Sequence, residues 1–79
     1  MSTAFTPRQG QYLAFIYYYT KVNRKPPSEA DIQRFFSVTA PSVHQMIVSL
    51  ERAGHIERKQ GQARSIRVLV SKPELPELE

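Results

Sequence analysis

The chain has 79 residues, 41% of them hydrophobic, which is enough for one small domain but includes no apolar run near the roughly 20 residues of a membrane span and no secretory signal. The absence of cysteine excludes disulfide bonds and cysteine-ligated zinc, and it suits a reducing compartment. The formal net charge is +4, and residues 1–73 hold all 11 lysines and arginines but only four of the seven acids. This basic excess favours a polyanionic partner, and the alternative explanation for the charge is solubility.

The first predicted helix covers about residues 7–22, after a short flexible lead at residues 1–5. Thr6 followed three residues later by Gln9 is a capping box, and proline suits the first helical position. The helix ends before Pro26-Pro27, because the residue before a proline avoids the α region. Its inward stripe, at helical spacing, comprises Leu13, Ile16, Tyr17 and Thr20, with Tyr12 and Tyr19 beside it.

Two further helices are predicted on either side of a tight break at residues 37–39. The helix over residues 29–36 has Ser28 as its N-cap and acids in its first turn, where they favour the positive end of the helix dipole. The third helix covers about residues 39–53 and stops at Gly54, which can take the left-handed conformation. Ile32 and Phe36 form the inner ridge of the helix over residues 29–36. The inner face of the third helix consists of Val43, Ile47 and Leu50.

Beyond the third helix the hydrophobic period changes from that of a helix to that of a strand. Residues 55–59 and 64–70 are predicted as two strands, joined by a hairpin connection at residues 60–63. Residues 72–79 hold two prolines and three acids, and we expect a flexible acidic tail there. The predicted domain is residues 6–71, with a mostly α (α+β) fold of three helices followed by a two-stranded antiparallel wing.

Two helices joined by a short turn and followed by a hairpin are the layout of a winged helix-turn-helix. The second helix of such a pair fits the major groove of B-form DNA, and the helix before it crosses the DNA backbone. The hairpin can then reach the adjacent backbone. We therefore expect sequence-specific binding of double-stranded DNA by a bacterial, cytoplasmic protein of the nucleoid that regulates transcription, as a repressor rather than an activator.

The outer face of the third helix holds the candidate base-reading residues. Gln45 lies near the centre of this small, polar face, where it can pair with adenine. On an isolated helix such a glutamine is more simply a solvated residue, but the helix-turn-helix favours contact with DNA. Backbone N–H groups at the start of the helix can hold a phosphate. The candidates on the recognition helix are Pro41, Ser42, Val43, His44, Gln45, Ser49 and Arg52, and those for the DNA backbone and the wing are Ser28, Thr39, Lys59, Gln62 and Arg64.

Several short segments carry a resemblance to a known family. They are Thr6-Pro7-Arg8-Gln9, Pro26-Pro27-Ser28 with Asp31 before Ile32, Ala40-Pro41-Ser42, Leu50-x-x-x-Gly54-x-Ile56, and Ala63-Arg64-Ser65-Ile66-Arg67. With these segments, residues 6–70 resemble the N-terminal DNA-binding domain of the LexA repressor family. The resemblance implies base contacts from the first turns of the recognition helix, at Ser42, Val43, Gln45 and Met46.

The sequence departs from the family pattern in three respects. It lacks the family's autoproteolytic domain with its serine–lysine dyad, which implies no self-cleavage and a different induction mechanism. The same domain provides dimerisation in the family, so a homodimer stays open as a partner. The recognition helix is one residue shorter and has Ser42, Gln45 and Met46 where the family has acidic and asparagine positions. The DNA site is therefore expected to differ.

Other functions have weaker support. The isolated His44 and His55 lack partners at metal-ligand spacing, and no paired acids, phosphate-binding loop or activated nucleophile is evident, so we expect no metal, cofactor, small-molecule substrate or enzymatic activity. Tyr18 is expected to face outward, which fits either a dimer contact or a lone surface tyrosine. The alternatives to specific DNA reading are a winged-helix protein-interaction module and a non-specific nucleoid-associated protein. Binding of structured RNA has no supporting motif.

Overall fold

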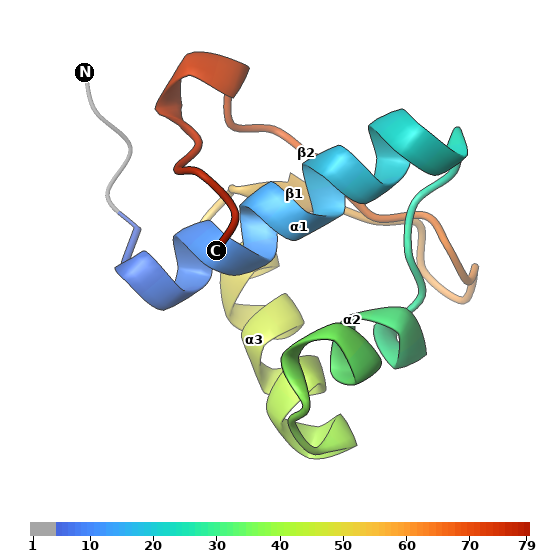
Figure 1. The fold of residues 1–79 in the computed structure, drawn as a ribbon. Coiled ribbons are helices and arrows are strands. Elements are labelled where there is room, and N and C mark those ends of the chain that lie inside the picture. Colours follow the sequence, from blue (N-terminus) through green and yellow to red (C-terminus); the bar gives the residue numbers. More distant parts are fainter. Residues whose placement is uncertain (1–4) are drawn as a thin grey trace.

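The computed structural model describes residues 5–79 and has three α-helices, a small antiparallel sheet and a short 3-10 helix in chain order (Figure 1). The helices are α1 (Pro7–Asn23), α2 (Glu29–Phe36) and α3 (Ala40–Arg52). The strands are β1 (Ile56–Glu57) and β2 (Arg67–Val68), and the 3-10 helix η1 spans Lys72–Glu74. This arrangement confirms the mostly α (α+β) winged helix-turn-helix that the sequence predicts.

Each α-helix begins after a residue whose side-chain hydroxyl accepts a hydrogen bond from a backbone N–H of the first turn, which has no partner within the helix. Such N-caps stabilise a helix by about 1 kcal/mol each. In α1 the capping box is complete, because the Gln9 side chain also accepts from the Thr6 N–H at 2.9 Å. The caps are Thr6, Ser28 and Thr39, which accept from the N–H groups of Gln9, Asp31 and Ser42. The predicted helix starts are therefore confirmed to within a residue.

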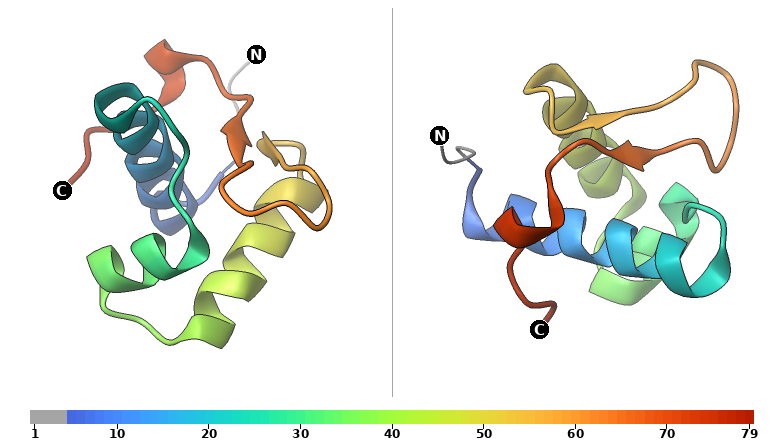
Figure 2. Two further views of the ribbon diagram at one scale, coloured as in Figure 1. Left: turned by 90° about the vertical axis from the view of Figure 1, so that its right-hand side faces the viewer. Right: turned by 90° about the horizontal axis from the view of Figure 1, so that it is seen from above.

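The hydrophobic core is shared by the three α-helices and the wing, with α1 passing over α2 and α3 (Figures 1 and 2). The predicted ridges of α2 and α3 supply buried Ile32, Val43, Ile47 and Leu50, with Phe36 only partly buried beside them. From the predicted stripe of α1, Leu13 and Ile16 are buried, whereas Tyr17 and Thr20 are half-buried. The core is completed by Tyr12, Phe15, Ile56 and Ile66.

The sheet is much shorter than the sequence predicts. Only the pairs Ile56 with Val68 and Glu57 with Arg67 lie opposite each other, in antiparallel register. Beyond them the backbone N–H of Lys59 donates to a side chain, the Ser65 hydroxyl, at 2.9 Å, instead of to a strand partner. The predicted strand bounds of 55–59 and 64–70 are therefore wrong, because a side chain takes over the backbone bonding of the wing.

The C-terminal segment, residues 72–79, packs against α1 (Figure 1). Leu75 and Leu78 are half-buried against the core. The side chain of Gln11 donates to one backbone carbonyl of this segment and accepts from its last N–H, each at 2.9 Å. No sequence pattern predicts this packing, because the two leucines are three residues apart and match neither a strand period nor a sustained helical stripe.

The predicted flexible lead covers residues 1–5, and its first four residues lie outside the described part of the chain. Phe5 is half-buried, with its ring edge against the ring of His55 at a centroid distance of 5.7 Å. At this residue the prediction is wrong, because the ring packs against the domain.

Candidate nucleic-acid interface

The outer face of α3 is the most accessible part of the helix-turn-helix. Pro41, Ser42, Gln45 and Arg52 are exposed on it, and Ser49 is half-buried. Within the part of the chain that the structure describes, no hydrogen bond or ion pair engages the side chain of Gln45 or of Arg52. The arrangement leaves the Gln45 carboxamide and the Arg52 guanidinium free for an external partner.

Val43, a candidate for DNA contact, lies on the inner face of α3 and not on its outer face. Its side chain is 0% exposed and forms part of the core with Ile47 and Leu50. A residue with no accessible surface cannot contact a base, so this candidate is wrong. The helical spacing itself places this position on the inner face of α3, together with Ile47 and Leu50.

The start of α3 offers fewer free backbone donors than expected. Pro41 has no N–H, and the N–H of Ser42 donates to the Thr39 hydroxyl at 3.2 Å. The Thr39 hydroxyl itself donates to the Ser42 hydroxyl at 2.9 Å. Of the first three positions, Ala40 alone keeps its N–H for a phosphate. A shallow depression of about 440 Å³ beside this turn is lined by Thr6, Gln9, Ser42, Gln45, Met46 and Ser49.

Arg58 ties the wing to both helices of the helix-turn-helix. Its guanidinium lies 3.0 Å from Glu51 at the end of α3 and 3.2 Å from Glu29 at the start of α2. His44 Nδ1 lies 3.6 Å from the other oxygen of Glu29. Arg58 thus pairs with both acids next to the recognition helix and offsets part of their negative charge. Sequence reasoning did not assign this role to Arg58, since its partners are 7 and 29 residues away.

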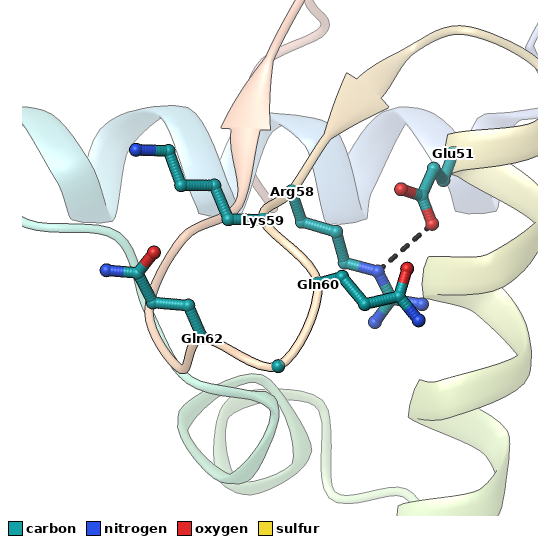
Figure 3. Close-up of a pocket in the computed structure, with 6 residues that line it drawn as sticks. Glu51, Arg58, Lys59, Gln60 and Gln62 are labelled. Atoms are coloured by element: carbon teal, nitrogen blue, oxygen red, sulfur yellow. Dashed lines mark hydrogen bonds and ion pairs between the residues drawn. The ribbon is translucent and has the colours of Figure 1, made fainter.

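The tip of the wing forms the wall of an open pocket beside the end of α3 (Figure 3). The pocket has a volume of about 340 Å³ and is lined by Glu51, Arg58, Lys59, Gln60, Gly61 and Gln62. Lys59 and Gln62 are exposed, and among the described residues neither side chain is held by an ion pair or hydrogen bond. The Lys59 ammonium therefore has no partner among the described residues.

Arg64 turns inward, across the domain. Its guanidinium lies 2.9 Å from the Asp31 carboxylate and 3.4 Å from both the Tyr19 hydroxyl and the Pro26 carbonyl. Arg64, a candidate for the DNA backbone, therefore has partners within the chain. No local sequence pattern predicts them, because Arg64 and Asp31 are 33 residues apart.

Asp31 is the centre of this cluster. The backbone N–H of Ser28, 3.0 Å away, is the largest cause that holds the pKa of Asp31 at about 2, below its usual 3.8. Burial opposes this shift, while the hydroxyls of Ser28 and Tyr19 and the charge of Arg64 add to it. The Ser28 hydroxyl is engaged as the cap of α2, so this candidate also has a role within the chain.

Residues 5–79 contain neither a membrane-spanning helix nor a cluster of metal ligands. None of the helices there is long and apolar enough to cross a membrane. In the same residues no three His, Cys, Asp or Glu side chains are grouped so that they could hold a metal ion. His44 lies on the surface, whereas His55 is buried beside Phe5.

Comparison with known proteins adds a family to this geometry. A family model described as LexA DNA binding domain matches residues 2–65, which include α1, α2, α3 and most of the wing. The chain is 40% identical over 63 residues to the LexA repressor of Thermotoga petrophila, 39% over 66 residues to that of Thermotoga neapolitana and 42% over 55 residues to that of Petrotoga mobilis. These alignments cover 80%, 84% and 68% of this chain and 32%, 34% and 27% of the relatives, so the chain spans about a third of their length. It belongs to the LexA DNA-binding domain family.

Proposed function

We propose that this protein binds a specific site in double-stranded DNA through the outer face of α3 and represses transcription by occupying that site. The observation that carries the proposal is the exposed, polar face around Gln45, which holds no acid, next to a wing tip with a free Lys59. Membership of a DNA-binding domain family supports it, and the relatives named above are called repressors. The proposed role is non-catalytic.

The proposed interface divides the contacts between bases and phosphates. In this fold α3 enters the major groove, α2 crosses the backbone and the wing reaches the adjacent backbone. Thr39, Lys59 and Gln62 are proposed for the backbone and the wing. Ser28 and Arg64 are left to their contacts within the chain. The residues proposed to face the groove are Pro41, Ser42, His44, Gln45, Ser49 and Arg52.

Repression by occupancy requires only that the bound protein blocks access to a promoter. We place such a protein in the bacterial cytoplasm, on the nucleoid. If two copies bind as a homodimer, their half-sites should lie about 10–10.5 bp apart, or a multiple of that, so that both recognition helices meet the same side of the duplex.

A protein-interaction module is the second candidate, because apolar side chains remain exposed. Phe35 is 45% exposed although its ring stacks on Phe15, and Val22 is 77% exposed. Tyr18 supports this candidate less than expected, since it is half-buried and packs against Tyr17. Such a module would bind DNA only at the non-specific level, with a Kd of roughly 10⁻⁴–10⁻⁶ M.

The deciding experiment is a selection of bound duplexes from a randomised library at physiological salt, followed by sequencing of the bound pool. We expect an enriched motif, and a palindromic one if the protein binds as a dimer. An unenriched pool together with weak, salt-sensitive binding would contradict the proposal and favour a nucleoid-associated protein or an interaction module.

A further inference from the structure

We propose that the DNA site of this protein consists of A·T pairs where the first turns of α3 meet the major groove. This inference rests on the proposed function and specifies its ligand. It follows from the exposed side chains in the first three turns of α3, which offer a carboxamide for adenine and apolar surface for thymine but no arginine, lysine or carboxylate for guanine or cytosine.

The burial of α3 fixes which side chains face outward. Val43, Ile47 and Leu50 are each 0% exposed. At about 100° per residue, the opposite side of the helix is then centred on Gln45 and includes Pro41. Both are exposed. Val48 lies beside them and is half-buried.

The chemistry of this face matches adenine and thymine. A glutamine carboxamide has one acceptor and two donors, and it pairs bidentately with the N6 amino group and N7 of adenine. Gln45 is free for this pairing, because no contact within the described residues holds its side chain. Apolar side chains contact the thymine C5-methyl group in the same groove, and Pro41 and Val48 provide such surface.

The groups that read guanine and cytosine are missing from this part of the helix. Guanine is read by arginine or lysine and cytosine by a carboxylate, yet residues 40–50 contain no Lys, Arg, Asp or Glu. The nearest acid, Glu51, is bound to Arg58 at 3.0 Å. Arg52 comes only at the last position of α3, beyond the first three turns.

Substitution of Gln45 tests the adenine contact. In the randomised selection, wild-type protein should favour A over other bases at one position by about 5- to 150-fold, the range measured for a good bidentate pair. Gln45→Ala should lose this preference and keep the rest of the motif. Gln45→Arg should change the preferred base there to G. Gln62→Arg is the matched control, since the same charge on the wing tip should raise affinity for every sequence alike.

Deoxyuridine in place of thymidine tests the methyl contacts, because uracil differs from thymine only by lacking the C5-methyl group. Each contacted position should lose about fourfold in affinity on this replacement, the amount expected for one buried methyl group. Pro41→Ala and Val48→Ala should each abolish the difference at one position. Circular dichroism and thermal unfolding of every variant check that it is folded.

The outcomes separate this inference from the proposed function. An enriched motif with G·C pairs at the Gln45-dependent position, or equal affinity for uracil and thymine at every position, would overturn the A·T assignment and leave specific DNA binding intact. A pool without any enriched motif would overturn the proposed function itself.

Discussion

At Asp31, four donors converge on one carboxylate. The backbone N–H of Ser28 and the Tyr19 hydroxyl bind it at 3.0 and 3.2 Å, and the guanidinium groups of Arg64 and Arg34 at 2.9 and 2.5 Å. A single side chain thus joins the first turn of α2 to α1 and to the wing. The wing is positioned by this carboxylate as well as by its two strand pairs.

The first prediction distinguishes two basic side chains of the wing. Arg64 is expected to hold the wing in place, and Lys59 is expected to contact a phosphate. Arg64→Ala should weaken binding to the DNA site, because the wing loses its anchor on Asp31. Its effect on the salt dependence of affinity should be nil, since the guanidinium is engaged within the chain. Lys59→Ala, the matched control with a free cation, should lower the slope of log K against log salt by about 1. Fluorescence anisotropy titrations at several salt concentrations measure both, and a reduced slope for Arg64→Ala would assign it to a phosphate.

The second prediction concerns the pH dependence of stability. Because folding lowers the pKa of Asp31 from 3.8 to about 2, its carboxylate stabilises the native state fully above pH 3.8. That contribution is lost as the pH falls through this interval towards 2, where the folded protein also binds the proton. Asp31→Asn should therefore have a lower free energy of unfolding than the wild type at pH 7, and the gap should narrow below pH 4. Urea denaturation across this pH range measures it. A gap that stays constant with pH would mean that the substitution acts through shape and not through charge.

At the scale of the elements, the starts of the helices were predictable and the bounds of the wing strands were not. A capping side chain and the N–H group that it binds lie three residues apart, as in Ser28 and Asp31. The start of a helix can therefore be predicted from the local sequence. The ends of the strands depend instead on Ser65, whose hydroxyl reaches Lys59 across the loop. The same division applies to the site: the exposed face around Gln45 follows from the helical period, whereas the engagement of Arg64 follows only from the tertiary fold.

The third prediction belongs to the wing. The Ser65 hydroxyl accepts from the Lys59 N–H and donates to the Gln62 carbonyl, both at 2.9 Å, so it closes the loop. Ser65→Ala should expose the Lys59 amide and cost about 1 kcal/mol of stability, as expected for a lost hydrogen bond. Amide hydrogen exchange at Lys59 should accelerate. Ser71→Ala, which removes a hydroxyl bond in the C-terminal segment, is the control and should leave that amide unchanged. Unaltered protection in Ser65→Ala would show that the backbone alone holds the loop.

At the scale of the whole molecule, both ends of the described chain cover α1. Phe5 and Pro76 each approach to 3.0 Å of the point where a Cβ at Gly10 would lie, so the absence of a side chain there lets the two segments close over the helix. A domain of this size buries a smaller fraction of its unfolded-chain surface than a large domain does, so every added apolar contact counts. In Figure 1 η1 lies above α1, the last residues pass in front of α1, and α3 lies below it. The C-terminal segment and the recognition helix thus lie on different sides of α1.

The fourth prediction follows from that separation. Leu75 and Leu78 are half-buried against the core, so Leu75→Ala and Leu78→Ala should each lower the free energy of unfolding by about 1–2 kcal/mol, less than a fully buried leucine. Leu69→Ala makes the same change at a side chain that is 46% exposed and should cost less. Urea denaturation ranks the three variants. Because the tail and α3 lie on different sides of α1, DNA affinity should be unaltered in all three under conditions where they are folded. Equal costs at Leu75 and Leu69 would mean that the C-terminal segment detaches in solution, and a loss of affinity in Leu75→Ala would mean that it supports the position of the recognition helix.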